Sequence, residues 1–463
     1  MIQRWLLLAL VVSGAVHADA IDDFVNSELA RQRIPGAALG IMHHGQLVRA
    51  AGYGFANIEH RVPVHPDTVF QTGSIGKQFT AAVVMLLVED GKVRLDESIR
   101  SYLPKAPKTW QPITLRHMLN HTSGLAWDPP LDLRKDYSDD ELLDLLYTVK
   151  LDFPAGSHWR YSNTAYELLG LMIRKVSGES YGDILAKRVF GPLHMRTARV
   201  ISDRDIVPNR AAGYEVTEAG TFNQERVSPT ANSTADGALY LTVLDYSKWN
   251  AALEAGGVLS AASWADVYRP ARLNSGKTYP YGFGWFLEHG QGRVYQHGGS
   301  WQGFQTFFIR YVDPQISVVV LTNSNSASPE IIARGVAARY EPKLALPPGM
   351  PIDDREPAVS ERVSRLIRQL MKGQPDAKEF AVMSPEDLKG YTTFYLTRLQ
   401  PLGELQEVRL FRRSEIGDDA LYLYRARFAN GLMNATLQLD PQAKVSRFAM
   451  HKVAAWDDAL PPE

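Results

Sequence analysis

Two groups of strand-like segments, far apart in the chain, enclose a long stretch with mainly helical pattern. The first group covers residues 37–57 and is typical of a hairpin that turns at His43-His44-Gly45. The second group begins at residue 281 and includes GFQTFFIRY and SVVVLTNS. Because strands need partners, the simplest assembly is one antiparallel sheet made from both ends, with the helical part beside it. This pattern predicts an α+β fold: an antiparallel sheet flanked by helices, plus a helical subdomain.

A proline-rich segment over residues 342–358 predicts a linker after this first region. Beyond it the pattern restarts with one apolar helical face, followed by four strand-like runs. We therefore predict a first domain over residues 21–341, the linker, and a separate small α+β domain over residues 359–463.

The first twenty residues have the pattern of a secretory signal peptide. Arg4 precedes the apolar run WLLLALVV, and the small residues of SGAVHADA follow it, with cleavage expected after Ala18 or Ala20. The apolar run is shorter than the ~20 residues that span a membrane, which argues against the alternative of an uncleaved anchor. We expect a periplasmic or secreted protein with no transmembrane anchor after cleavage.

Composition excludes several classes of function. The 463 residues carry 50 basic and 51 acidic side chains without a long charged run, which argues against a nucleic-acid partner. The chain has no cysteine, so it can form neither a disulfide nor a thiol nucleophile. His117 and His121 could ligate a metal from one helical face, but no third ligand is evident. We expect no metal and no cofactor, and the sequence does not indicate an oligomeric state.

The stretch QTGSIGKQFTAA, residues 71–82, carries the first candidate for chemistry. Ser74 precedes Lys77 by three residues at a helix start, so both side chains are expected on one face. A desolvated lysine has a lowered pKa and can accept the serine proton, and helix N–H groups favour a developing oxyanion. The alternative interpretation of this S-x-x-K motif is a helix cap followed by a solvated lysine.

The second candidate is the YSN stretch that contains Tyr161 and Asn163. Tyr161 could relay a proton if Lys77 acidifies its phenol. The Asn163 amide could contact both the lysine and a substrate carbonyl, or it could simply cap the following helix.

The third candidate is the HGGS stretch of residues 297–300. Gly298 and Gly299 weaken a strand, which predicts a close approach of the backbone to something, and a ligand beside the strand would explain both. His297 would then point at that ligand as a donor; the alternative is a bulge with an incidental histidine.

Taken in order, S-x-x-K, Y-x-N and H-G-G resemble the motifs of the serine β-lactamase and DD-peptidase superfamily. TLRHMLNHTSGL, YSNTAYELLGLMIRKVSGESY, FGPLHM and YGFGWF resemble its class C-type branch, which includes esterases and aminopeptidases. The resemblance covers about residues 22–340 and implies a β-lactamase/transpeptidase-like fold. The last hundred residues resemble cystatin/NTF2-like modules in pattern only.

The resemblance also implies a role for each matching residue. Ser74 would be acylated, Lys77 and Tyr161 would share the work of the base, and Asn163 would hold substrate and lysine. The N–H groups of Ser74 and Ser300 would form the oxyanion hole, with His297, Gly298 and Gly299 lining the substrate. His297 stands where most β-lactamases carry lysine, and a histidine is charged only in part near neutrality, which puts efficient penicillin hydrolysis in doubt.

These observations predict an exported serine hydrolase that forms an acyl-enzyme with a small-molecule or peptide substrate. The bond would be an ester, or an amide of a small acyl or D-amino-acid peptide substrate. Asp236 and Tyr240, near the expected wall of the site, depart from the family pattern and are expected to alter substrate shape. The alternatives are a weak β-lactamase and a non-catalytic binding protein.

Overall fold

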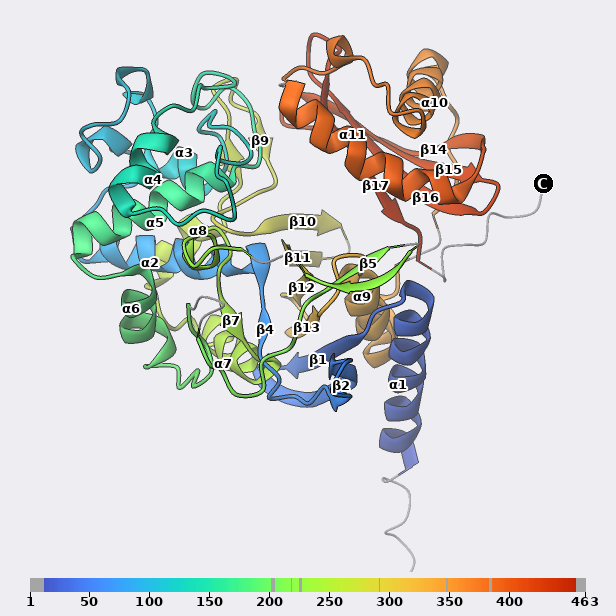
Figure 1. Ribbon diagram of the computed structural model, residues 1–463, viewed down its shortest axis with the longest axis horizontal. Helices are drawn as coiled ribbons and strands as arrows, with labels where there is room; N and C mark the ends of the chain where they lie inside the picture. The colour runs from blue at the N-terminus through green and yellow to red at the C-terminus, as the bar shows by residue number, and fades with distance from the viewer. Residues whose placement is uncertain are drawn as a thin grey trace, which may run out of the picture. The chain divides into compact units, whose positions relative to one another are not determined.

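The computed structural model of the protein forms two compact units (Figure 1). The first unit comprises Met1–Arg272 and Pro280–Ala345, and the second comprises Leu273–Tyr279 and Leu346–Glu463. The structure describes residues 12–200, 205–217, 219–224, 227–290, 292–346, 349–382 and 385–454.

The first unit is built on a seven-stranded antiparallel sheet with the order β10-β11-β12-β13-β1-β2-β3. Its strands are β1 Gly36–His43, β2 Gln46–Asn57, β3 Val62–Pro63, β10 Phe286–Gly290, β11 Gly292–Trp301, β12 Phe304–Tyr311 and β13 Ile316–Thr322. In the middle of the sheet β1 pairs with β13, with Ala37 opposite Thr322 and His43 opposite Ile316. The prediction that both ends of the region contribute to one sheet is confirmed.

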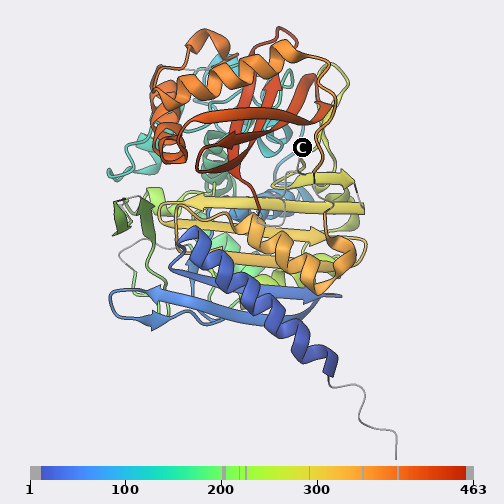
Figure 2. The ribbon, with the colours of Figure 1, turned by 90° about the vertical axis from the view of Figure 1, so that its right-hand side faces the viewer.

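Two helices cover one face of this sheet, α1 Val12–Gln32 and α9 Pro329–Tyr340 (Figure 2). Their apolar residues and those of the sheet form one core, which includes Phe24, Val25, Ile332, Val336, Ile309, Val318 and Val320. Since the other face is covered as well, β13 is buried along its whole length. This burial on both faces explains why SVVVLTNS is an apolar run without alternation.

The start of α1 lies inside the predicted signal peptide, whose residues 1–11 are outside the described residues. The helix runs through both expected cleavage positions, so the structure leaves the cleavage site as a prediction. Among the residues that the structure describes, no helix combines the length and apolar character needed to cross a bilayer.

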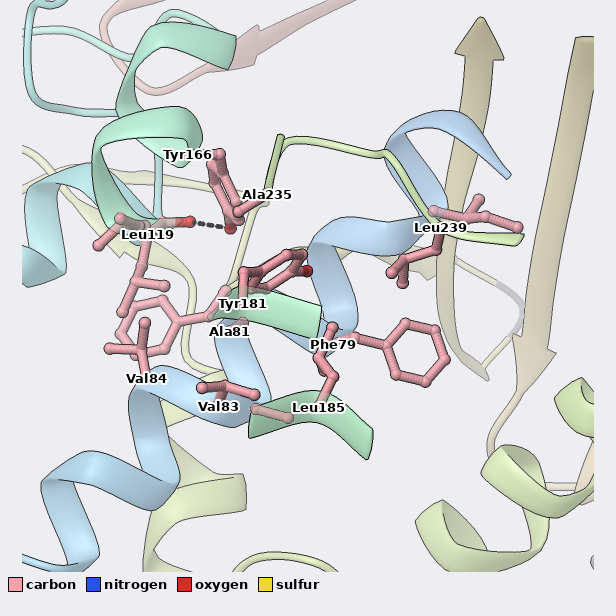
Figure 3. Packing of buried hydrophobic residues seen from close by; sticks show 14 of the residues in the cluster. Phe79, Ala81, Val83, Val84, Leu119, Tyr166, Tyr181, Leu185, Ala235 and Leu239 are labelled. Carbon is pink, nitrogen blue, oxygen red and sulfur yellow. Dashed lines mark hydrogen bonds between the residues drawn. The ribbon is translucent and has the colours of Figure 1, made fainter. Parts of the chain in front are cut away.

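The helical subdomain surrounds α2 Lys77–Glu89, which is buried almost all round. Phe79, Val83 and Val84 on this helix lie among residues from other elements, including Leu119 and Tyr166 (Figure 3). Its other helices are α3 Leu115–Leu119, α4 Asp139–Leu146, α5 Asn163–Ser177, α6 Tyr181–Leu185 and α8 Ala261–Val267. Helix α7 Val243–Glu254 packs against β1, β2 and β13 of the sheet. The short strands of the first unit are β4 Phe70–Gln71, β5 Tyr214–Thr217, β6 Gly220–Asn223, β7 Tyr240–Leu241 and β8 Ala271–Arg272. The short strand β9 Thr278–Tyr279 belongs to the segment Leu273–Tyr279 of the second unit.

Phe79 provides a test of this core. Its fully buried ring lies 4.5 Å from the Trp249 ring and 5.7 Å from the Phe190 ring, measured between centroids. Phe79→Ala should lower the free energy of unfolding by about 3–5 kcal/mol, because it removes these contacts and leaves a cavity. Denaturant titration would measure the loss. Phe222→Ala, at a ring 51% exposed, is the control and should change it by less than about 1 kcal/mol; equal losses would contradict the assignment of the core.

The second unit contains α10 Pro357–Met371, α11 Pro385–Leu399 and a four-stranded antiparallel sheet in the order β14-β15-β16-β17. These strands are β14 Leu405–Ile416, β15 Asp419–Phe428, β16 Gly431–Leu439 and β17 Val445–Lys452. The apolar face predicted for α10 is buried in the core of this unit, at Val363, Leu366, Ile367 and Leu370. The small α+β architecture predicted here is confirmed.

Candidate active site

The turn that carries Ser74 is held against β11 by a glycine. After β4 the chain enters a 3-10 turn, Gly73–Gly76, and the α-helix begins only at Lys77. Gly73 has a φ of +56°, and a Cβ there would lie 2.6 Å from the backbone nitrogen of Ser300. Only glycine allows this conformation and this approach without strain. Ser74 and Ser300, proposed from the motifs as the two oxyanion donors, therefore lie on adjoining backbones.

Lys77 is fully buried and connects three parts of the site. Its Nζ donates to Ser74 Oγ at 3.2 Å, to Asn163 Oδ1 at 2.7 Å and to the carbonyl of Asp236 at 2.5 Å. An ammonium group has three N–H donors, so these contacts use all of them. The alternative of a solvated lysine behind a helix cap is wrong.

Burial lowers the pKa of Lys77 to about 8, against the opposing effect of the nearby carboxyl groups of Asp236, Asp128 and Glu167. A lysine with this pKa is neutral in a substantial fraction of molecules near pH 8, whereas an exposed lysine is not. Neutral Lys77 can therefore take a proton from Ser74 across the contact already formed.

Tyr161 does not behave as expected. Its ring lies 4.9 Å from Lys77 Nζ, but burial raises the pKa of the phenol well above its usual range, and the neighbouring Ser74 hydroxyl only partly opposes this. The hydroxyl is buried without a hydrogen bond of normal geometry. The condition set for a proton relay, acidification of the phenol by Lys77, is therefore not met: burial dominates, and the phenol keeps its proton.

Asn163 is the first residue of α5, and Ser162 caps the helix by accepting a hydrogen bond from the N–H of Ala165 at 3.1 Å. The capping alternative for Asn163 is thus wrong. Its amide oxygen accepts from Lys77, while its Nδ2 donates to Asp128 Oδ1 at 2.7 Å. Asp128 was not predicted from the sequence; its one signal there is its position three residues after the end of the HTSGL segment.

His297 lies on β11, is 2% exposed, and carries no charge at ordinary pH. Burial lowers its pKa to about 3, which corrects the expectation of a partly charged ring. Its Nδ1 contacts the Gly298 carbonyl at 2.6 Å and its Nε2 contacts the Tyr281 hydroxyl at 3.0 Å. Since a carbonyl only accepts, we assign the proton of the neutral ring to Nδ1.

His121 continues this hydrogen-bond chain towards the Tyr161 loop. Its Nδ1 accepts from the N–H of Ser162 at 3.1 Å, so its Nε2 carries the proton and donates to the Tyr281 hydroxyl at 3.1 Å. Tyr281 then donates to His297. The chain has one consistent donor order, and it ties the loop before α5 to β11.

The histidine pair weighed as a metal site is not on one helical face. The helix ends at Leu119, and His121 has a φ of +62°. His117 accepts from the N–H of Thr114 as part of a capping box at the other end. Within the described ranges, no group of three or more His, Asp or Glu side chains is arranged to hold a metal ion.

The two glycines after His297 differ in what surrounds them. A Cβ on Gly299 would lie 2.0 Å from the Thr72 carbonyl oxygen and 2.3 Å from Thr306 Oγ1, whereas a Cβ on Gly298 would meet Phe307 at an ordinary 3.6 Å. At Gly299 the close approach predicted here is made by the turn before Ser74. Ser300 is exposed, and its Oγ accepts from Gln305 at 2.8 Å.

The two residues that depart from the family pattern are both buried. The Asp236 backbone contacts Lys77, and its carboxylate accepts from Thr234 Oγ1 at 2.6 Å. Tyr240 donates to Gln71 at 2.8 Å and, with Arg210 among others, lines a cavity of about 370 Å³. Of the two, Asp236 makes a direct contact with the Ser74–Lys77 pair.

Comparison with known proteins identifies the family of the chain. Residues 21–340 match the Beta-lactamase family, and the protein belongs to it. Among curated proteins, penicillin-binding protein 4* of Bacillus subtilis (strain 168) is 31% identical over 303 residues, which is 60% of this chain and 66% of that protein. A D-aminopeptidase of Gluconobacter oxydans (strain 621H) is 27% identical over 324 residues, 67% of this chain and 60% of that protein. The chain thus spans less than two thirds of the length of these relatives.

Solved structures confirm the fold class. D-amino acid amidase from Ochrobactrum anthropi SV3, complexed with D-phenylalanine, superimposes with a TM-score of 0.61 at 25% identity, covering 71% of this chain and 98% of that one. The octameric penicillin-binding protein homologue from Pyrococcus abyssi gives a TM-score of 0.60 at 21% identity, covering 94% of this chain and 99% of that one. At that identity the second comparison shows the fold alone.

Proposed function

We propose that this protein is an exported serine hydrolase that cleaves an ester or an amide through an acyl-enzyme on Ser74. The observation that carries the proposal is the 3.2 Å contact between Ser74 Oγ and the buried Lys77, whose pKa is lowered to about 8. A serine hydroxyl becomes a competent nucleophile when an adjacent base takes its proton, and this pair meets that condition.

In the proposed reaction, Lys77 takes the Ser74 proton while Oγ attacks the substrate carbonyl carbon. The N–H groups of Ser74 and Ser300 stabilise the oxyanion. As the ester or amide bond breaks, the leaving group receives a proton from the Tyr161 hydroxyl, which Lys77 then restores. Water, deprotonated by the same base, attacks the acyl carbon. The bond to Ser74 Oγ then breaks, Lys77 returns the proton to that oxygen, and the acid is released. Asn163 holds Lys77 and contacts the substrate amide.

Two observations favour esters and D-amino-acid derivatives over β-lactams as substrates. Neutral His297 offers no permanent charge to the carboxylate of a penicillin. Relatives and neighbours include a D-aminopeptidase and a D-amino acid amidase by name. Weak β-lactamase activity is the second candidate function of the same site.

The remaining parts of the proposal concern the rest of the chain. From the resemblance of its motifs, we also propose that the first unit belongs to the class C-type branch. Residues 1–20 act as a signal peptide, cleaved after Ala18 or Ala20, which gives a periplasmic or secreted enzyme. The domain limits are residues 21–341 and 359–463 around the proline-rich linker, and the helices and single sheet of the second unit fit a cystatin/NTF2-like module.

Intact-mass spectrometry tests the proposal. The mature protein is incubated with a fluorophosphonate and, separately, with a penicillin, and we expect one fluorophosphonate adduct that maps to Ser74. Ser74→Ala is the matched control and should gain no mass. A lasting penicillin adduct would favour peptidase-like activity, and a fluorophosphonate adduct alone would favour an esterase. If the folded protein gains neither adduct, the proposal of an enzyme is overturned and that of a non-catalytic binding protein is supported.

A further inference from the structure

The catalytic hydrogen-bond chain continues from Asn163 to a carboxylate, that of Asp128. Asp128 is exposed, and its Oδ1 accepts from Asn163 Nδ2 at 2.7 Å. The same amide accepts from Lys77, which contacts Ser74. Asp128 is therefore joined to the nucleophile through two side chains, and its backbone position is set by α5 rather than by its own loop alone.

The residue before it provides an apolar surface at the same place. Trp127 is 45% exposed, although its ring centroid lies only 5.3 Å from that of the buried Tyr161. Its carbonyl accepts from the N–H of Asn163 at 2.6 Å, so the backbone of this pair is anchored to the first turn of α5. An indole held beside a catalytic group but open to solvent offers contact area to a ligand rather than to the core.

The charges around Ser74 favour a cation over an anion. His297 and His121 are both kept neutral by burial. Lys77, whose pKa is about 8, is mostly protonated at pH 7, but its three N–H donors are taken by Ser74, Asn163 and the Asp236 carbonyl. The negative charge of the exposed Asp128 carboxylate raises the pKa of Lys77 and so partly opposes the effect of burial. A substrate carboxylate would find no cation with an uncommitted N–H donor among these groups, whereas an ammonium group would find a carboxylate and an aromatic face.

We infer that Asp128 and Trp127 form an amine-binding subsite of the hydrolase. Asp128 would bind the protonated amine on the carbon next to the scissile carbonyl, and Trp127 would contact the apolar side chain on the same carbon. The substrate class is then an amide or ester of an amino acid whose α-amine is free and whose side chain is apolar. This inference rests on the proposed function and assigns the acyl part of its substrate.

The test compares D-phenylalanine p-nitroanilide with its N-acetyl derivative, which lacks the charge. Because ionisation of the enzyme affects both substrates equally, its effect cancels in the ratio of their kcat/KM values. We expect the free amine to be preferred by at least about tenfold at pH 7, the factor that about 1.4 kcal/mol supplies. The preference should fall as pH rises past about 8, because an α-amine loses its proton there. This measurement needs no variant; equal rates across the range would overturn the subsite.

Variants then assign the residues. Asp128→Asn should reduce the preference ratio about tenfold, whereas Asp132→Asn, at an exposed aspartate of the same loop, should leave it unchanged. Trp127→Ala should reduce kcat/KM for the D-phenylalanine substrate about tenfold more than for the D-alanine analogue. An unaltered ratio in Asp128→Asn would overturn the role of Asp128, and equal losses on both substrates would overturn that of Trp127.

Fluorophosphonate labelling separates this inference from the function on which it rests. If the wild-type protein labels on Ser74 and hydrolyses p-nitrophenyl butyrate but shows no preference for the free amine, the proposed hydrolase function stands and the amine-binding subsite is overturned. If the protein does not label, both the proposed function and the subsite are overturned.

Discussion

Lys77→Met should reduce kcat/KM for p-nitrophenyl butyrate by about 10³-fold, within the range that loss of a general base produces. Methionine matches the length of the buried stem but cannot take the Ser74 proton. In the wild-type enzyme the neutral amine is the active form, so kcat/KM should rise with pH and level off above a pKa of about 8. No inflection near pH 6.5 is expected from His297, whose pKa burial lowers to about 3.

Lys175→Met, at an exposed lysine of α5, is the matched control and should retain wild-type turnover. A stopped assay across pH 5–10 gives both the loss and the profile. A Lys77→Met enzyme that keeps a tenth of the activity, or a wild-type profile that is flat between pH 7 and pH 9, would contradict the assignment of the base.

Gly299→Ala should lower both stability and turnover. The added methyl group would enter the space of the Thr72 carbonyl and of Thr306 Oγ1, at 2.0 and 2.3 Å. The nearer of these two atoms, the Thr72 carbonyl oxygen, belongs to the backbone and cannot rotate away as a side chain could. Strand β11 must therefore move away from the turn that carries Ser74. We expect the free energy of unfolding to fall by about 3 kcal/mol, at the upper end for overpacking. Turnover should fall by about 10²-fold as the Ser300 N–H leaves its position.

The adjacent glycine provides the comparison. Gly298→Ala introduces the same methyl group on the same strand, but its nearest neighbour is Phe307 at 3.6 Å. Its thermal midpoint should stay close to that of the wild type, while that of Gly299→Ala drops. Similar midpoints for the two variants would show that the contact with Thr72 does not constrain the strand.

Local patterns in the sequence predicted the parts of the molecule that depend on neighbouring residues. The hairpin at His44, the burial of the α10 face, and the placement of Ser74 and Lys77 on one side of a turn follow from spacings of two, three or four residues. The sheet made from both ends of the first region also followed, because strand segments without local partners must pair with each other.

The properties that the sequence did not predict arise from burial and from contacts between distant segments. Asp128 meets Asn163 35 residues further on, and Tyr281 joins His121 across 160 residues. No local pattern specifies such pairs. The neutral state of His297 and the raised pKa of Tyr161 depend on how completely the fold removes each side chain from water. Motif matching names such residues without giving their protonation states.

The pairing of early and late strands has a consequence during synthesis on the ribosome. Thr306 of β12 donates a hydrogen bond to the carbonyl of Thr72, 234 residues earlier in the chain. At ordinary rates of translation that interval takes roughly 10–50 s, during which β1 has no β13 beside it. The nucleophile is thus made long before the strand that completes its surroundings, and a nascent chain that has not reached residue 300 contains Ser74 and Lys77 but cannot yet form their oxyanion site.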